Sequence, residues 1–218
     1  MNSALKTQTY VAKGNAPWFN NDWLDIDKVI SMNRSDSETT VVCDGNVDRM
    51  INMFHSCDNL TSIDLSNFDT SNVANMDGMF YDCSKLATLD LSNFDTSKVH
   101  GMSYMFFNCY NLTSLDLSNF NTSKVTDMRN MFDSCYRLTT LDLSTFDTSK
   151  VDDMTCMFIG CFNLVTIKGV IDMKSCKDTD YYNMFIGCHK LKNVKIKNPP
   201  NNFERNSGLS SSQYTIVS

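Results

Sequence analysis

The chain has 218 residues, and 19 Lys and Arg against 25 Asp and Glu give it a net charge of −6. Nucleic acids and anionic lipids require a basic face, so the acidic balance excludes both as default partners. No apolar run is long enough for a transmembrane helix, and we expect no membrane insertion. Residues 1–11 lack the apolar core of a signal peptide, so no export signal is seen. If the protein works outside a cell, we expect that it is exported by another route or that a signal peptide has been removed.

Most of the chain repeats with a period of 26 residues. One cysteine column shows it, with a last step of 27 residues: Cys57, Cys83, Cys109, Cys135, Cys161 and Cys188. Such a period is typical of repeat proteins whose turns bury their faces by stacking on neighbours. Because each cysteine recurs once per turn, we interpret the column as buried free thiols rather than a disulfide framework. We expect no metal centre, since metal ligands must converge on one point.

Residues 1–38 do not follow the period. They contain a cluster of aromatic residues, Trp18, Phe19 and Trp23. A rough helical stripe follows from Leu24 to about Met32. We interpret the segment as an N-terminal cap over the open end of the stack or as a docking arm for a partner.

Residues 39–197 contain the repeats, and each repeat has two halves. In the first half, buried and outward positions alternate, as in Ile63, Asp64 and Leu65, which predicts a strand. An Asp-Thr-Ser triplet follows and favours a helix start. In the second half, residues 73–83 and their equivalents carry Val, Met, Phe and Cys at spacings of three and four, which predicts a short helix. The fold class expected is an α/β repeat solenoid, with a parallel sheet on one face and short helices on the other.

The repeated motif LxxLDLSxF, followed by DTSxVxxMxxMFxxC, closely resembles the bacterial BspA-like leucine-rich repeat family over roughly residues 39–197. Phenylalanine stands where many leucine-rich repeats hold Asn or Cys: Phe68, Phe94, Phe120 and Phe146. The resemblance implies a right-handed leucine-rich-repeat solenoid. It also implies the adhesive or interaction roles of bacterial and protozoan surface proteins and of some phage proteins.

Residues 198–218 are interpreted as a C-terminal cap. Residues 194–197 are predicted to form the last strand of the repeats, and Pro199 and Pro200 discourage further pairing beyond it. The run 213–217 is β-prone and is predicted to fold back as a final strand.

The outward strand positions form the first candidate binding surface. They are Asp64, Asp90, Asp116, Asp142, Lys168 and Lys195. Neighbouring like charges would lie about 4.8 Å apart in a parallel sheet and repel one another, and the sign of the charge reverses toward the C-terminus. Three interpretations remain open: a solvated face without a ligand, a docking surface for a basic partner or cation, and head-to-tail self-association.

Aromatic residues that directly follow a Met-Phe pair or a cysteine of the column form another candidate surface, the aromatic flank. They are Tyr81, Phe107, Tyr110, Tyr136 and Phe162. An exposed aromatic row could contact protein or sugar, and packing between adjacent turns is the alternative.

No nucleophile motif, phosphate-binding loop or HExxH motif is present, so we expect no catalytic residues, no enzyme activity and no cofactor. The sequence favours a non-enzymatic recognition or adhesion module. We favour a phage virion component, such as a head-decoration, fibre or tail protein, with a bacterial cell-surface adhesin or a structural spacer as alternatives. The partner would be a protein or glycan on a host surface or another subunit of an assembly, and a homo-oligomer is compatible with the sequence.

Overall fold

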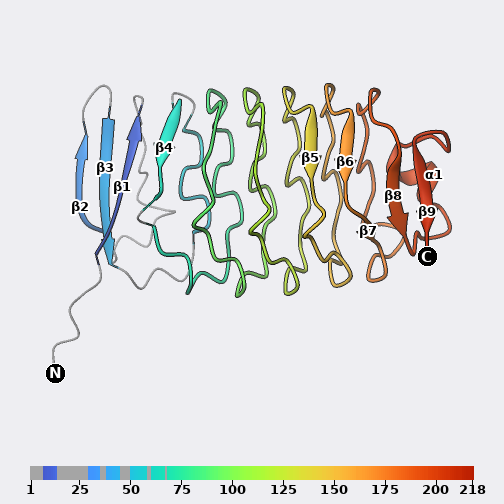
Figure 1. Cartoon of the computed structure of the whole chain (residues 1–218), viewed down its shortest axis with the longest axis horizontal. Coiled ribbons are helices and arrows are strands. Elements are labelled where there is room, and N and C mark those ends of the chain that lie inside the picture. Colours follow the sequence, from blue (N-terminus) through green and yellow to red (C-terminus); the bar gives the residue numbers. More distant parts are fainter. Residues whose placement is uncertain (1–6, 14–28, 35–37, 45–49, 58–59, 67) are drawn as a thin grey trace.

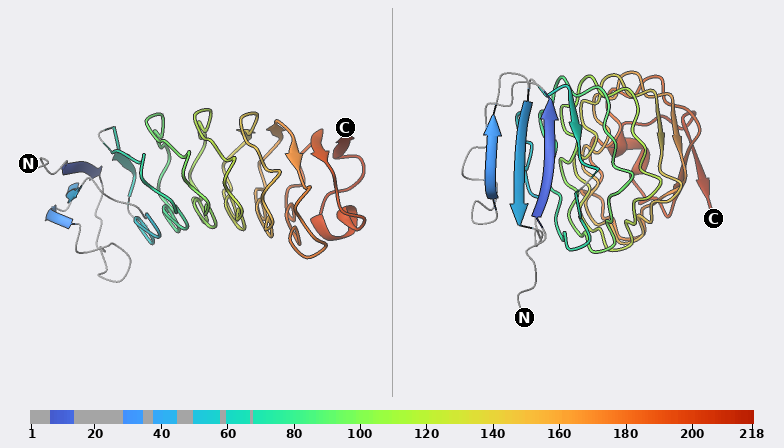
Figure 2. Two further views of the ribbon diagram at one scale, coloured as in Figure 1. Left: turned by 90° about the horizontal axis from the view of Figure 1, so that it is seen from below. Right: turned by 60° about the vertical axis from the view of Figure 1, so that its left-hand side comes forward.

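Successive repeats of the chain lie side by side along the long axis of an elongated molecule (Figure 1). The computed structural model describes residues 7–13, 29–34, 38–44, 50–57, 60–66 and 68–218, and of the first three segments it describes the backbone. The views in Figure 2 show the same arrangement, with the N-terminal strands at one end of the stack and the C-terminal strands at the other.

Three small sheets contain the strands of the described residues. The first is antiparallel, in the order β2-β3-β1-β4, and consists of β1 (Thr7–Lys13), β2 (Val29–Arg34), β3 (Glu38–Asp44) and β4 (Ser62–Asp64). The second pairs β5 (Thr140–Asp142) with β6 (Thr166–Lys168) in parallel. The third is parallel and consists of β7 (Ile171–Asp172), β8 (Val194–Lys197) and β9 (Tyr214–Val217). One short helix, α1 (Phe203–Ser207), precedes β9.

The pairing between repeats follows the period of the sequence. Leu141 lies opposite Ile167, one period later, and isolated parallel bridges join Asn75 to Gly101 and Gly101 to Asp127. Equivalent residues of neighbouring repeats therefore lie next to one another, and each column of the aligned repeats becomes a row in space. The part of the expected fold that is confirmed is the presence of small parallel sheets with repeat-like stacking.

The expected short helices behind the strands are not formed in the described repeats, and this prediction was wrong. Residues 76–83 and their equivalents form turns instead. The Met79 N–H donates to the Met76 carbonyl (3.2 Å), whereas the Phe80 N–H donates to the Met105 carbonyl of the next repeat (2.9 Å). In an α-helix the amides after the first turn would bond to carbonyls four residues earlier in the same segment. Here alternate amides bond to the neighbouring repeat instead, and we name these stretches the turn segments.

Left-handed backbone explains why the turn segments are not helical. Two residues of residues 76–83, Gly78 and Asp82, have positive φ angles of 60° and 61°. The equivalent positive-φ residues in the other turn segments are Asn52, Ser56, Tyr104, Asn108, Asn130, Ser134, Cys156, Gly160, Asn183 and Gly187. A positive φ interrupts a right-handed helix and is tolerated best by Gly, Asn and Asp, which occupy most of these positions.

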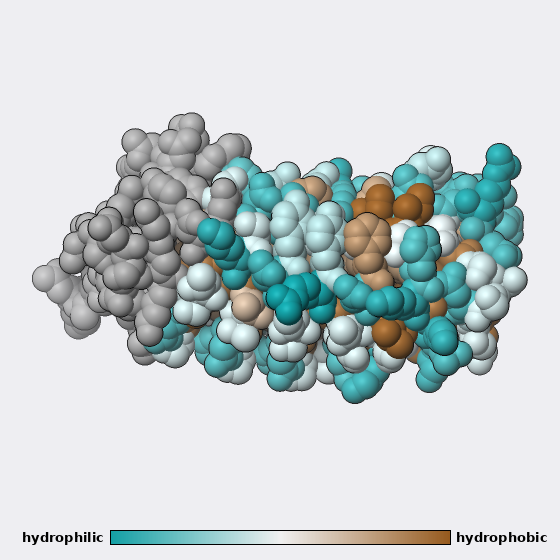
Figure 3. All heavy atoms as spheres, turned by 90° about the horizontal axis from the view of Figure 1, so that it is seen from above, coloured by the Kyte–Doolittle hydropathy of each residue, from teal (hydrophilic) through white to brown (hydrophobic). Residues whose placement is uncertain are grey.

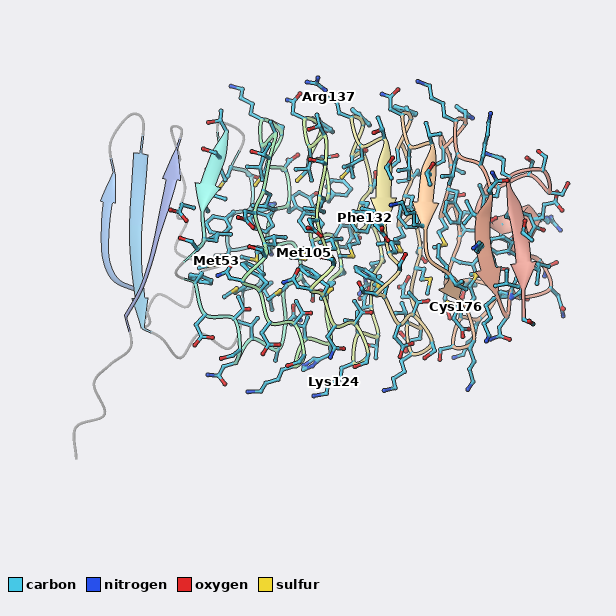
Figure 4. All side chains as sticks on the ribbon, in the orientation of Figure 1. Met53, Met105, Lys124, Phe132, Arg137 and Cys176 are labelled. Atoms are coloured by element: carbon cyan, nitrogen blue, oxygen red, sulfur yellow. The ribbon has the colours of Figure 1, made fainter. Side chains whose placement is uncertain are left out.

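Rows of apolar side chains fill the space between the strands and the turn segments. One row of phenyl rings runs through six repeats: Phe54, Phe80, Phe106, Phe132, Phe158 and Phe185. Neighbouring ring centroids are 5.2 to 5.8 Å apart, with interplanar angles of 3° to 13°. Figure 4 shows Met53, Met105 and Phe132 within the stack, while Lys124 and Arg137 point outward at its opposite edges.

The cysteine column is part of this core. Its members are buried free thiols, as the period predicts. Each thiol from the second repeat onward bonds to a phenylalanine carbonyl of the preceding repeat, and the Cys109 thiol donates to the Phe80 carbonyl at 3.2 Å. The thiols therefore connect neighbouring repeats.

Buried threonines form a second polar row. The Thr122 hydroxyl donates to the Asp147 carbonyl (3.1 Å) and accepts from the Asp147 N–H (2.8 Å) of the next repeat. Thr70, Thr96 and Thr148 make the same pair of bonds. The Asp-Thr-Ser triplet thus joins neighbouring repeats instead of starting a helix, which corrects its predicted role.

The N-terminal segment joins the stack by strand pairing. β1 lies between β3 and β4 and is antiparallel to both, with Val11 opposite Asp64. β2 covers residues 29–32, so the helical stripe expected there was wrong. Residues 24–28 of that stripe lie outside the described residues.

The C-terminal segment covers the last turn segment. The Asn183 and Phe185 amides donate to the carbonyls of Asn206 and Ser207 (2.8 and 2.7 Å), so the end of α1 takes the place of a further repeat. The predicted final strand is confirmed as β9, which pairs with β8. Residues 194–197 form β8, as predicted. The expectation that Pro199 and Pro200 discourage pairing beyond β8 was wrong, because both prolines lie past the end of the strand and its own amides can pair with β9.

The stacked phenyl row should contribute strongly to stability. We expect Phe106→Ala to lower the free energy of unfolding by about 3–5 kcal/mol, because it leaves a cavity between two rings. Phe162→Ala is the matched control: its ring is 49% exposed, and we expect a loss of about 1 kcal/mol. Urea unfolding followed by circular dichroism measures both, and equal losses would contradict a special role for the row.

The threonine row can be tested with an isosteric change. Thr122→Val leaves the Asp147 N–H without its acceptor and the Asp147 carbonyl without its donor. We expect a loss of about 1–3 kcal/mol in the free energy of unfolding. Thr126→Val, at an exposed position, should change stability by less than about 0.5 kcal/mol.

Candidate functional site

The outward positions of the strand half form one continuous surface, which we call the strand face. Ile63 and Leu65 are buried and Asp64 between them is exposed, as the alternation predicts. The other outward positions, Asp90, Asp116, Asp142, Lys168 and Lys195, are also exposed. The strand face therefore brings all six predicted residues to one side of the stack, and their role in binding stays a prediction.

Each aspartate of the strand face is held by the chain that follows it. The carboxylates of Asp90 and Asp116 accept the backbone N–H of Ser92 and Ser118, both at 2.9 Å. These hydrogen bonds, with those of the serine hydroxyls, hold the pKa of both aspartates below the usual range. The carboxylates are consequently charged at neutral pH, although they lie one repeat apart.

The charge of the strand face reverses between β5 and β6. Asp142 lies opposite Lys168, and the Lys168 Nζ is 3.1 Å from an Asp142 carboxylate oxygen. Hydrogen bonds from Ser144, followed by the Lys168 ammonium, lower the pKa of Asp142 to about 2. Both side chains are largely exposed, so this ion pair marks the boundary between the acidic and basic parts of the face rather than a strong contact.

An open depression of about 370 Å³ lies in the acidic part of the strand face. Its lining residues are Ser62, Ile63, Thr88, Leu89, Asp90, Ser114 and Asp116. Hydroxyl groups and two carboxylates surround an apolar floor, which suits a cationic side chain with an aliphatic stem. The described residues contain no group of three or more His, Cys, Asp or Glu side chains that could hold a metal ion.

The aromatic flank consists of two separate stacked rows. Tyr81 stacks on Phe107, with ring centroids 4.6 Å apart, and His55 packs against Tyr81. In the second row Tyr136 lies between Tyr110 (4.7 Å) and Phe162 (5.1 Å). Within these rows the ring faces contact one another, which leaves mainly the ring edges for other molecules. This geometry favours the packing interpretation of the flank.

Apolar side chains gather toward the C-terminal half of the face that Figure 3 shows. The exposed large apolar side chains of the described residues include Phe162, Val165, Tyr182 and Ile186. The three N-terminal aromatic residues proposed for docking, Trp18, Phe19 and Trp23, lie outside the described residues.

Acidic groups among the turn segments were missed by the sequence interpretation. Asp133 is buried at the position that continues the row of His55, Tyr81 and Phe107, and it accepts hydrogen bonds from Asn130 Nδ2 and Ser134 Oγ, both at 2.8 Å. Burial raises the pKa of Asp133, although these bonds oppose the shift. This buried carboxylate could have been found in the sequence, because an aspartate stands there where the preceding repeats have His or an aromatic residue.

Asp127 is a second such group. It is half-buried, and burial raises its pKa although Arg129 Nη2 lies 2.7 Å from its carboxylate. Arg129 Nη1 also lies 3.7 Å from Asp153, so one guanidinium serves two neighbouring acidic groups of adjacent repeats. Asp127 and Asp153 are thus joined through Arg129 outside the strand face.

The two partly buried cysteines outside the column are poor nucleophiles. Burial raises the pKa of Cys176 to about 12 and also raises that of Cys156. The thiolate is the reactive form, so both thiols are nearly all protonated at neutral pH.

Asp133 should make stability depend on pH. Its pKa is raised in the folded state, so protonated Asp133 favours folding. This contribution to stability is complete below the ordinary Asp pKa of about 4 and is lost as the pH rises through the pKa of the folded state. We therefore expect Asp133→Asn to be more stable than the wild type near about pH 7, with the difference shrinking toward about pH 4. Urea unfolding at both pH values measures this, and Asp152→Asn at an exposed position is the control. A variant less stable near neutral pH would show that the bonds to Asn130 and Ser134 outweigh burial.

Comparison with known proteins identifies one family. Its model matches residues 32–115 and 87–198, which together span well over half of the chain. No curated protein and no solved structure matches the chain. The described residues contain no helix with the length and hydropathy that crossing a bilayer requires. On the extent of the match, the chain belongs to the family described as "Mycoplasma protein of unknown function, DUF285".

Proposed function

We propose that the chain is a non-enzymatic recognition module that holds a basic macromolecular partner on its strand face. The observation that carries the proposal is the row of four exposed aspartates, three of which have lowered pKa values. A row of fixed charges at the spacing of the repeats complements a chain with regularly placed Lys or Arg side chains. The depression beside Asp90 and Asp116 offers a place for one such side chain.

We further infer that the stacked repeats form a solenoid of the BspA-like leucine-rich repeat type. The 26-residue register of β5 with β6, the parallel bridges and the continuous core support this class. In place of helices, the side opposite the strands consists of turn segments. A stack of this kind presents a long surface on which equivalent side chains are held at fixed intervals, as recognition of an extended partner requires.

The place where the module works is part of the proposal. We favour a virion component of a phage, in which the strand face mediates attachment or assembly, and a bacterial cell-surface adhesin is the alternative. Co-purification of the full chain with particles from its source supports the first. Binding of the purified chain to cells, lost when the strand face is reversed in charge, supports the second. A chain that associates with neither would act as a spacer in a larger assembly.

The strand face can be tested with an oligolysine peptide as the probe. We expect the double variant Asp90→Lys and Asp116→Lys to bind the peptide at least about tenfold more weakly in calorimetry at low salt, because it reverses the centre of the acidic row. The matched control is Asp95→Lys with Asp147→Lys, which changes the net charge equally at exposed positions outside the strand face. We expect that control to weaken binding by less than about threefold. Equal weakening by both variants would mean that net charge, and not the strand face, binds the peptide.

A further inference from the structure

The outer edge of β9 is unpaired in the part of the chain that the structure describes. β9 pairs with β8 on one side, and no described strand lies on its other side. The Val194 N–H donates to the Gln213 carbonyl (2.9 Å), and peptide groups along a strand alternate between its two edges. The Ile216 N–H consequently points away from β8. β9 therefore offers backbone donors and acceptors to another strand.

Nothing in the composition of β9 protects this edge. Proteins usually block exposed edges with Lys, Pro or a bulge. β9 has the sequence YTIV, without charge or proline, whereas β8 beside it carries Lys195 and Lys197. Ile216 is 61% exposed, the largest value among the exposed large apolar side chains of the described residues. An unprotected edge beside an exposed apolar side chain is typical of a strand that pairs with another chain.

A second unpaired edge lies at the opposite end of the molecule. β2 occupies the outer position of the first sheet, and among the described residues it pairs with β3 alone. Figures 1 and 2 place β2 and β9 at the two ends of the long axis. A copy of the chain could thus meet another copy end to end without any change in the stack.

The two ends differ in charge. Residues 160–218 contain eight Lys and Arg against four Asp and Glu, a net charge of +4. Residues 1–49, which include β1, β2 and β3, contain five against seven, a net charge of −2. Two copies that meet through the same end repel each other, whereas the C-terminal end of one copy attracts the N-terminal end of the next. Charge therefore selects head-to-tail contact over the symmetric alternatives.

We propose that the chain assembles head to tail with copies of itself, the outer edge of β9 in one copy pairing with the outer edge of β2 in the next. The pairing adds a strand to each sheet and covers Ile216. Because the two edges are different surfaces, the contact is heterologous and continues from copy to copy as an open series. This assembly does not depend on the recognition of a basic partner by the strand face.

Light scattering coupled to size-exclusion chromatography, with sedimentation velocity, tests the assembly on the full chain. At about 0.1 M salt the average mass should grow past the dimer as concentration rises. At about 1 M salt, where the screening length falls from about 10 Å to about 3 Å, association should weaken at least about threefold. We expect Ile216→Pro, which removes an outward N–H without removing a bond to β8, to leave the chain monomeric. The matched control Ile216→Val keeps the amide and a β-branched side chain and should still assemble.

A second blocking variant tests whether the effect of Ile216→Pro comes from local misfolding of β9. Ile216→Glu keeps the amide but places a charged carboxylate, which would have to lose its water, at the contact between the two strands. It should also stop growth, with far-ultraviolet circular dichroism and the melting temperature unchanged. A wild type that is monomeric at every concentration, a dimer that does not grow, or growth that persists in both blocking variants would each overturn the assembly. Both blocking variants should bind oligolysine as the wild type does, which separates this outcome from that of the strand-face variants.

Discussion

Backbone hydrogen bonds between neighbouring turn segments are the interaction on which the rest of the molecule depends. In each turn segment, alternate amides donate to carbonyls of the next repeat at 2.6 to 3.1 Å, while the amides between them close local turns. The strand half is less regular: within the described chain, no strand is assigned at residues 88–90 and 114–116. The turn side therefore sets the register of the stack, and the positive-φ residues of each turn segment are what allow its amides to point along the long axis.

Polar side chains in the core reinforce this arrangement. The thiol row bonds each repeat to the one before it, and the threonine row bonds each repeat to the one after it. Asn93 and Asn119 extend the same pattern, each donating to carbonyls of the preceding repeat. Since a buried polar group costs free energy unless it is bonded, these rows favour one register and make every repeat depend on its neighbours. At the C-terminal end, α1 supplies the carbonyls that a further repeat would have supplied.

Stacking also determines what the surface can do. A residue that recurs in the sequence becomes a row in space, so a single outward aspartate per repeat becomes a line of charge. Aromatic residues that recur once per repeat stack on one another instead. Tyr136, for example, stacks on Tyr110 and on Phe162. The charges of the strand face are therefore exposed in a row, while β2 and β9, at the two ends of the stack, lie in segments of opposite net charge. Both of the interaction surfaces that we propose have one physical origin, the one-dimensional repetition of the parts of the molecule.

The sequence by itself determined the period, the buried columns, the outward direction of Asp64 and its equivalents, and the strand near the C-terminus. Each of these depends on local alternation or on a recurrence that is visible in one dimension. Only the tertiary structure decided between helix and turn in residues 76–83, because apolar spacings of three and four satisfy both, and the choice depends on whether an amide such as that of Phe80 finds its acceptor within its own segment or in the next repeat. The pairing of β1 with β4 and the burial of Asp133 between rows were likewise undecided, because both are set by residues far away in the chain that come together when the repeats stack.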